Sequence, residues 1–125
     1  MDAKERVTEC RLKGYCCSQT VMALYLEDVG MENEDLINAM AAFCGGMHKG
    51  KICGCIAGAA AALSVSDAAY AKDSAQEELM QWFHEQFGGY DCYELIADDP
   101  QKRIEYCPTI MLETYLKLSE YIAEK

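Results

Sequence analysis

The chain has 125 residues, of which 51% are hydrophobic and 26% charged, and it contains only 2 prolines. This length is typical of one compact domain, so we expect residues 1–125 to form a single domain. The composition excludes a disordered chain and a membrane span. The 11 basic and 21 acidic residues leave a net charge of −10, which repels nucleic acid and anionic membranes, so we expect neither as a partner.

The 8 cysteines are the unusual part of this composition. They make up less than the roughly 8–10% that is typical of short secreted disulfide scaffolds. The N-terminal sequence alternates in charge and has no apolar stretch of the length that a signal peptide requires, so we expect a cytoplasmic protein. Reducing conditions in that compartment favour metal ligands, catalytic thiols or redox switches over permanent cross-links.

Hydrophobic residues recur with helical periodicity and strand-like alternation is absent, which predicts an all-α fold, a compact bundle of five to six helices. The first helix is expected to end near Gly14 and the second to run from Cys17 to Gly30. Asn33 can cap the third helix. Residues 44–58, which follow it, hold 5 of the 9 glycines and predict tight turns or a close approach of the backbone to another group.

An alanine-rich helix is predicted from Ala57 to Leu63, and Gly54 and Gly58 would let a neighbouring helix pack closely against it. A longer helix, capped by Ser66 or Asp67, should end at residues 88–89. A short helix over residues 93–97 and a polar turn near Pro100 follow. Pro108 suits the first position of the last helix.

Half of the cysteines fall at the predicted start of a helix: Cys17, Cys53, Cys92 and Cys107. A helix N-terminus carries unpaired N–H groups and a partial positive charge, which favour the thiolate, the form that attacks disulfides and binds metals. The alternative is that each of these cysteines is a weak cap or a small buried residue. Cys10 lies on the apolar face of the first helix and is predicted to be a packing residue.

The remaining cysteines lie beside those at helix starts. Adjacent cysteines form only a strained disulfide, so Cys16 is predicted to be a spare thiol or an accessory ligand. Cys53 and Cys55 can form a small, easily reduced ring or place two sulfurs on one metal. No C-x-x-C occurs, which excludes a thioredoxin-type site. His48, in the glycine-rich segment, can serve as a ligand or a general base.

Several blocks of the sequence resemble the C_GCAxxG_C_C family of redox-active proteins, named after its four cysteines and a C-G-A-x-x-G motif. Residues 14–21 resemble the first block, with Cys17 in the motif position, and residues 53–58 resemble the C-G-A-x-x-G motif, with Cys55 in place of alanine. Residues 87–92 and 106–108 supply the third and fourth motif cysteines, Cys92 and Cys107. Cys44 replaces a residue that is usually glycine. The resemblance implies a helical domain with redox-active cysteines.

The first hypothesis for function is that the motif cysteines converge at one end of the bundle and bind an iron–sulfur cluster or another soft metal such as zinc. The proposed ligands are Cys17, Cys53, Cys92 and Cys107, with Cys16, Cys44, Cys55 and His48 as accessory ligands. Such a protein would transfer electrons or sense redox state with a redox partner protein that the sequence does not identify. The sequence is also compatible with a homo-oligomer.

The second hypothesis is a metal-free thiol–disulfide protein. Cys53 would be the attacking thiol, since Lys49, Lys51 and a helix start lie nearby, and Cys55 or Cys44 would resolve the mixed disulfide. The third hypothesis is a structural helical protein with inert, buried cysteines.

Overall fold

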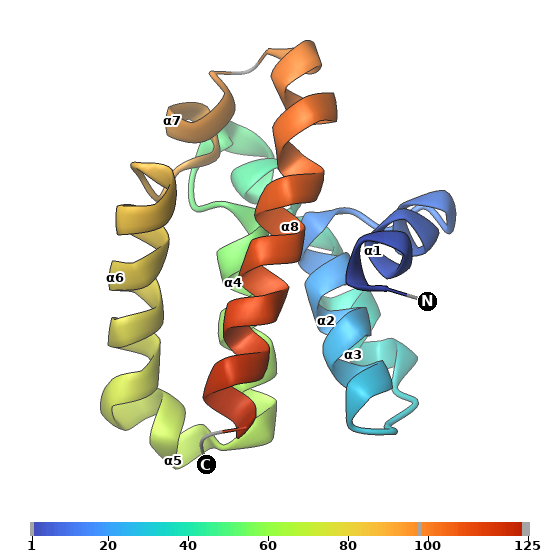
Figure 1. The fold of residues 1–125 in the computed structure, drawn as a ribbon, viewed down its shortest axis with the longest axis vertical. Coiled ribbons are helices and arrows are strands. Elements are labelled where there is room, and N and C mark those ends of the chain that lie inside the picture. The colour runs from blue at the N-terminus through green and yellow to red at the C-terminus, as the bar shows by residue number, and fades with distance from the viewer. Residues whose placement is uncertain (1, 98, 124–125) are drawn as a thin grey trace.

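The computed structural model describes residues 2–97 and 99–123. Within this part of the chain the fold is all-helical, as predicted, and the only strand-like pairing is an isolated antiparallel bridge between Ile52 and Asp91. The first half of the chain contains α1 (Ala3–Leu12), α2 (Cys17–Asp28), α3 (Glu34–Ala39) and a 3-10 helix (Ala41–Phe43). The second half contains α4 (Gly54–Ser66), α5 (Ala68–Tyr70), α6 (Gln76–Phe87), α7 (Cys92–Ile96) and α8 (Pro100–Ala123) (Figure 1).

The predicted number of helices, five to six, is too low. A π-helical turn (Ala71–Ala75) joins α5 to α6 in one continuous run, so the described residues contain seven α-helical runs. Two of these, α3 with six residues and α7 with five, are too short to be stable in isolation and depend on packing. No helix in the described part of the chain has both the length and the apolar character needed to span a lipid bilayer.

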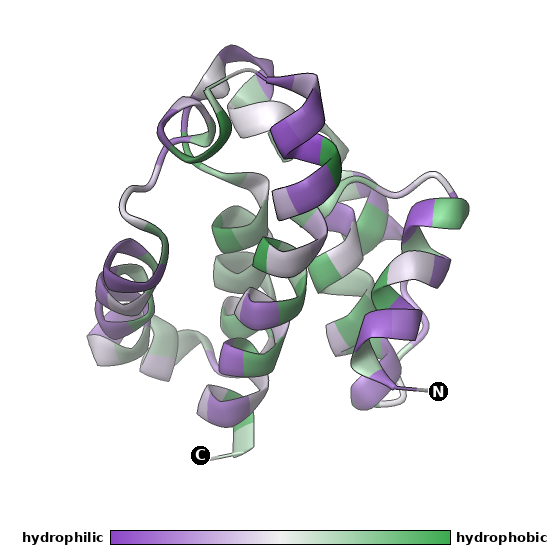
Figure 2. Cartoon of the chain, turned by 45° about the horizontal axis from the view of Figure 1, so that its top comes forward, coloured by the Kyte–Doolittle hydropathy of each residue, from purple (hydrophilic) through white to green (hydrophobic). Residues whose placement is uncertain are grey.

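The core lies where α2, α4 and α8 pack together (Figure 1). Figure 2 shows that α4, in the middle of the bundle, is hydrophobic along most of its length, and that hydrophilic residues lie on the outer turns of α6 and α8. Leu24, Leu63 and Leu118, one from each helix, are fully buried. A Cβ atom at Gly58 would lie 2.6 Å from the carbonyl oxygen of Ser18. The expected close approach of a second helix to the alanine-rich one is thereby confirmed, with α2 as the partner.

Three of the predicted helix-capping and helix-ending residues have these roles in the structure. The Asn33 side chain accepts a hydrogen bond from the N–H of Leu36 at 3.2 Å, and Asp67 accepts one from Tyr70 at 3.1 Å. Gly88 ends α6 with a φ of 86°, a conformation that glycine adopts without steric cost. These caps depend only on neighbouring residues in the chain, which is why the sequence reveals them.

The last helix differs from the prediction, because α8 begins at Pro100 and runs through Pro108 without interruption. The Asp99 side chain accepts a hydrogen bond from the N–H of Gln101 at 2.9 Å, so Asp99 and Pro100 supply the cap and the first position. A proline inside a helix loses one backbone hydrogen bond, and burial of residues after it, such as Ile110 and Met111, offsets that loss. The longer helix extends beside α7 at the top of Figure 1.

Candidate functional site

Two backbone hydrogen bonds hold the glycine-rich segment against the start of α7. The N–H of Cys53 donates to the carbonyl of Tyr90 at 2.8 Å, and the N–H of Cys92 donates to the carbonyl of Lys51 at 2.6 Å. These bonds flank the bridge between Ile52 and Asp91. They place Cys53, the N-cap of α4, beside Cys92, the first residue of α7.

A left-handed turn (residues 45–48) precedes this pairing. Met47 and His48 have φ values of 63° and 61°, a conformation that costs a residue with a side chain roughly 1–2 kcal/mol. The N–H of Gly45 donates a hydrogen bond to the thiolate of Cys17. A Cβ atom at Gly46 would lie 2.9 Å from the Cβ of Cys92. The left-handed turn therefore lies between two of the motif cysteines and contacts both.

Cys17 occupies the first position of α2 and its sulfur packs directly on Gly54 of α4, where a Cβ atom would overlap it. A hydrogen bond from the Cys55 thiol is the main cause that lowers the pKa of Cys17, and the N–H groups of Gly45 and Ser18 contribute. Their combined effect exceeds the opposing effect of burial and brings the pKa to about 6. Cys17 is therefore a thiolate at neutral pH.

Cys55 is the hydrogen-bond partner of both Cys17 and Cys53. Its contact with Cys53 lowers the pKa of that thiol, while the pKa of Cys55 itself is raised well above its usual value by the same two contacts and by burial. Cys55 is therefore the proton donor to both sulfurs, that of the Cys17 thiolate and that of Cys53. The expectation that lysines activate Cys53 is not supported, since hydrogen bonds to the sulfur, and not Lys49 or Lys51, are the main causes that lower its pKa.

The other motif cysteines, Cys92 and Cys107, have raised pKa values. Burial is the main cause at both positions, and the negative charges of Cys17 and Cys53 add to it. The pKa of Cys107 reaches about 11. Arg103, one helical turn before Cys107, opposes these shifts at both thiols and hydrogen-bonds to Cys92. The four motif thiols are thus close enough for their charges to interact.

The prediction that each motif cysteine begins a helix is correct for Cys17 and Cys92 at first positions and for Cys53 at an N-cap. It is wrong for Cys107, which lies inside α8. The N–H groups of a helix start therefore do not reach Cys107. The positive charge near Cys107 comes instead from Arg103, which lies in the same helix. The sequence signal that predicts this is the pair Asp99 and Pro100, because a helix that starts there includes Arg103.

A disulfide joins Cys16 and Cys44, whose Cα atoms are 6.0 Å apart. The interpretation of Cys16 as a spare thiol or accessory ligand is therefore wrong, and Cys44 is not available to resolve a disulfide at Cys53 in this state. The Ser18 hydroxyl lies 3.5 Å from the sulfur of Cys16 and 3.3 Å from that of Cys44, and it donates to the carbonyl of Met40 at 2.7 Å. Sequence reasoning missed this fully buried serine.

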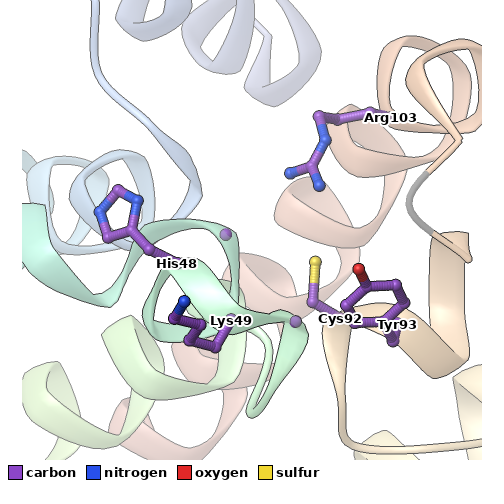
Figure 3. Close-up of a pocket in the computed structure, with 7 residues that line it drawn as sticks. His48, Lys49, Cys92, Tyr93 and Arg103 are labelled. Carbon is purple, nitrogen blue, oxygen red and sulfur yellow. The ribbon is translucent and has the colours of Figure 1, made fainter.

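A cleft of about 470 Å³ opens beside Cys92 (Figure 3). His48 and Lys49 line it from the glycine-rich segment, and Tyr93 and Arg103 line it from α7 and α8. Figure 3 shows the sulfur of Cys92 and the guanidinium of Arg103 pointing toward the same space. His48 thus belongs to the wall of this cleft.

Cys10, near the C-terminal end of α1, is buried in the hydrophobic core, as the sequence predicts for a packing residue.

The cysteine cluster meets only one of the two requirements of a soft-metal site. Its donors are all thiols, the ligand type that iron–sulfur clusters and zinc prefer. Their geometry does not meet the requirement, because no three His, Cys, Asp or Glu side chains in residues 2–97 and 99–123 stand in an arrangement that would hold a metal ion. The donor chemistry fits a soft metal, and the arrangement of these side chains does not.

The fold and the site define a class of small all-helical proteins that gather several cysteine thiols at one end of the bundle. Residues 15–121 match the family described as "Putative redox-active protein (C_GCAxxG_C_C)", and the chain belongs to this family. The resemblance inferred from the sequence blocks is thereby confirmed over nearly the whole chain. No match was found among curated proteins or among solved structures.

Proposed function

We propose that this protein is a thiol–disulfide redox protein in which Cys17 is the attacking thiolate. The observation that carries the proposal is the contact of Cys17 with the Cys55 thiol and the N–H of Gly45, which holds the pKa of Cys17 near 6. Thiol–disulfide exchange requires a thiolate that is accessible. Cys17 is partly exposed, whereas Cys53 is only 7% exposed, so Cys17 replaces Cys53 as the attacking thiol.

The first chemical step joins the protein to its redox partner. The Cys17 sulfur attacks one sulfur of a disulfide in the partner, a new S–S bond forms between the two proteins, and the partner's other sulfur leaves as a thiolate. This step removes the negative charge from Cys17. The Cys55 thiol, which the Cys17 thiolate previously held protonated, then keeps Cys53 as its remaining hydrogen-bond partner.

The second step releases the partner. Cys53, in the thiolate form that its lowered pKa favours, takes the proton of Cys55. Cys55 then attacks the Cys17 sulfur, so that a Cys17–Cys55 disulfide forms and the partner leaves with its second thiolate. The partner's disulfide gains two electrons and the two thiols of this chain lose two. The contacts of Cys55 with both other sulfurs support this assignment.

The test is the pH dependence of alkylation, with the modified cysteine identified by mass spectrometry. The wild-type protein should contain a fast thiol that titrates near pH 6 and maps to Cys17. Cys17→Ser should lose this titration and Cys10→Ser should keep it. With a disulfide substrate, Cys55→Ser should accumulate a mixed disulfide at Cys17. If the fast thiol persists in Cys17→Ser, the proposal is wrong.

A second candidate function is soft-metal binding by the motif cysteines, for electron transfer or redox sensing. Burial is the main cause that raises the pKa of Cys107, and the charges of the nearby Cys17 and Cys53 sulfurs add to it. The added repulsion is the supporting observation, because a bound cation would relieve it. The described arrangement lacks a metal-holding group, so no step is derived through a metal.

Anaerobic purification with a visible spectrum and analysis of iron, sulfide and zinc separates the two candidates. Soft-metal binding is supported if the purified protein contains stoichiometric metal that is lost in Cys107→Ser and kept in Cys10→Ser. Metal-free protein that still exchanges disulfides in the Cys107→Ser variant supports the thiol mechanism, since Cys107 takes no part in that mechanism.

A further inference from the structure

The cleft beside Cys92 differs in charge from the rest of the molecule. The chain carries a net charge of −10, yet the cleft is lined by Lys49 and Arg103 together with His48. None of the described residues that line it is acidic. In a chain with 21 acidic and 11 basic residues, a cleft whose described ionisable side chains include two basic ones and no acidic one is unusual.

The walls of the cleft come from separate parts of the chain that the fold holds together. The left-handed turn contributes Gly45 and His48, and the ring of Tyr93 packs so closely on Gly50 that a Cβ atom there would overlap it. The strained φ of 61° at His48 keeps this residue in the cleft wall at an energetic cost. Backbone strain of this kind persists where the surrounding structure imposes it, and it is common at ligand sites.

We propose that this cleft binds a small oxygen-bearing anion, a carboxylate or an oxoanion, beside the sulfur of Cys92. The planar guanidinium of Arg103 and the ammonium of Lys49 are the groups that recognise such anions. Arg103 comes from α8 with its guanidinium toward the sulfur of Cys92, and Lys49 lines the cleft from the glycine-rich segment across from it (Figure 3). A volume of about 470 Å³ accommodates a small organic molecule or a hydrated inorganic ion.

The position of the cleft connects the anion to the cysteine cluster. Cys92 lines the cleft, and Gly45, which lines it as well, donates its N–H to Cys17. A bound anion would therefore lie next to the redox site and limit access to Cys92. Binding of the anion requires no thiol reaction, so this inference and the proposed thiol chemistry can fail independently.

The test is calorimetric titration at low ionic strength with inorganic phosphate and, separately, with acetate. Wild-type protein should bind at least one of them saturably, and the tighter of the two identifies the anion as an oxoanion or a carboxylate. Arg103→Gln and Lys49→Gln should each weaken binding by about tenfold or more, since each removes a charge-assisted hydrogen bond. The matched control is Lys13→Gln, which removes the same charge at the end of α1 and should leave the affinity unchanged.

A second measurement locates the anion. Saturating phosphate or acetate, whichever binds, should slow alkylation of Cys92 in the wild-type protein, and this protection should disappear in Arg103→Gln. The proposal is overturned if neither anion binds saturably, if Lys13→Gln weakens binding as much as Arg103→Gln, or if bound anion leaves the alkylation rate of Cys92 unchanged.

Discussion

The two ends of α2 both carry polar clusters, but the clusters differ in how their charges are balanced. At the C-terminal end, Arg6 makes a 2.8 Å ion pair with Asp28 and donates to the hydroxyl of Tyr115 at 2.8 Å, and Tyr115 donates to Asp28. At the N-terminal end, the Cys17 thiolate lies near the Cys53 sulfur, and its negative charge opposes the ionisation of Cys53.

This difference separates a structural cluster from a reactive one. Opposite charges that pair and share hydrogen bonds are satisfied and have no tendency to react, so the cluster of Arg6, Asp28 and Tyr115 ties α1, α2 and α8 together. Like charges gathered around one buried thiol favour any step that removes a charge. Disulfide formation and cation binding both do so, and this is the physical reason for which we propose redox chemistry at the N-terminal end of α2.

The largest expected effect is on the pH dependence of stability. The pKa of Cys17 is about 6 in the folded protein and 9.0 for an ordinary thiol, so its thiolate stabilises the fold fully above pH 9, and this contribution is lost as the pH falls through 6. Between pH 9 and pH 6, urea unfolding should show that the wild type loses up to about 4 kcal/mol more stability than Cys17→Ser. Parallel pH profiles of the two proteins would contradict the assignment.

The next effect concerns the packing that positions the reactive end. In Gly58→Ala the new methyl group clashes with the backbone of Ser18. Backbone atoms cannot rotate away as a flexible side chain can, so α2 and α4 must move apart. We expect a loss of about 2–3 kcal/mol in the free energy of unfolding, measured by urea denaturation. The exposed Ser64→Ala in the same helix is the control, with a change below about 0.5 kcal/mol. An unchanged stability in Gly58→Ala would show that the two helices tolerate separation.

At the C-terminal end of α2, Arg6→Ala should lower the free energy of unfolding by about 1–2 kcal/mol, because Asp28 and Tyr115 lose a charged partner. The loss is modest because water partly solvates Asp28. Arg11→Ala, an exposed change in the same helix, is the control. The titration of Cys17 should stay near pH 6 in both variants. A shift of that titration in Arg6→Ala would show that the two ends of α2 are coupled.

The smallest expected effect is in Gly54→Ala, where the new methyl group occupies the space of the Cys17 sulfur. The sulfur must turn away from its donors, the Cys55 thiol and the N–H of Gly45, so we expect the pKa of Cys17 to rise by about one unit. The ultraviolet absorbance of the thiolate as a function of pH measures this shift. An unchanged titration would mean that these hydrogen bonds do not set the pKa.

Much of the fold was predictable because its signals are local. The caps at Asn33 and Asp67 and the terminating Gly88 act within one helical turn, so they can be recognised without knowledge of the fold. Three of the four motif cysteines were placed correctly at helix starts for the same reason. Pro108 misled the prediction, because the packing of α8 outweighs the local cost of a proline.

The sequence by itself determined the all-helical fold, most helix ends and the membership in a redox-active cysteine family, since each depends on periodicity or on short motifs. Only the tertiary structure decided which sulfurs meet. The disulfide of Cys16 and Cys44 spans 28 residues, and Cys55 lies between Cys17 and Cys53 because α2 packs against Gly54. The reactivity of a thiol depends on groups brought beside it by packing, and no local signal in the sequence reports those neighbours.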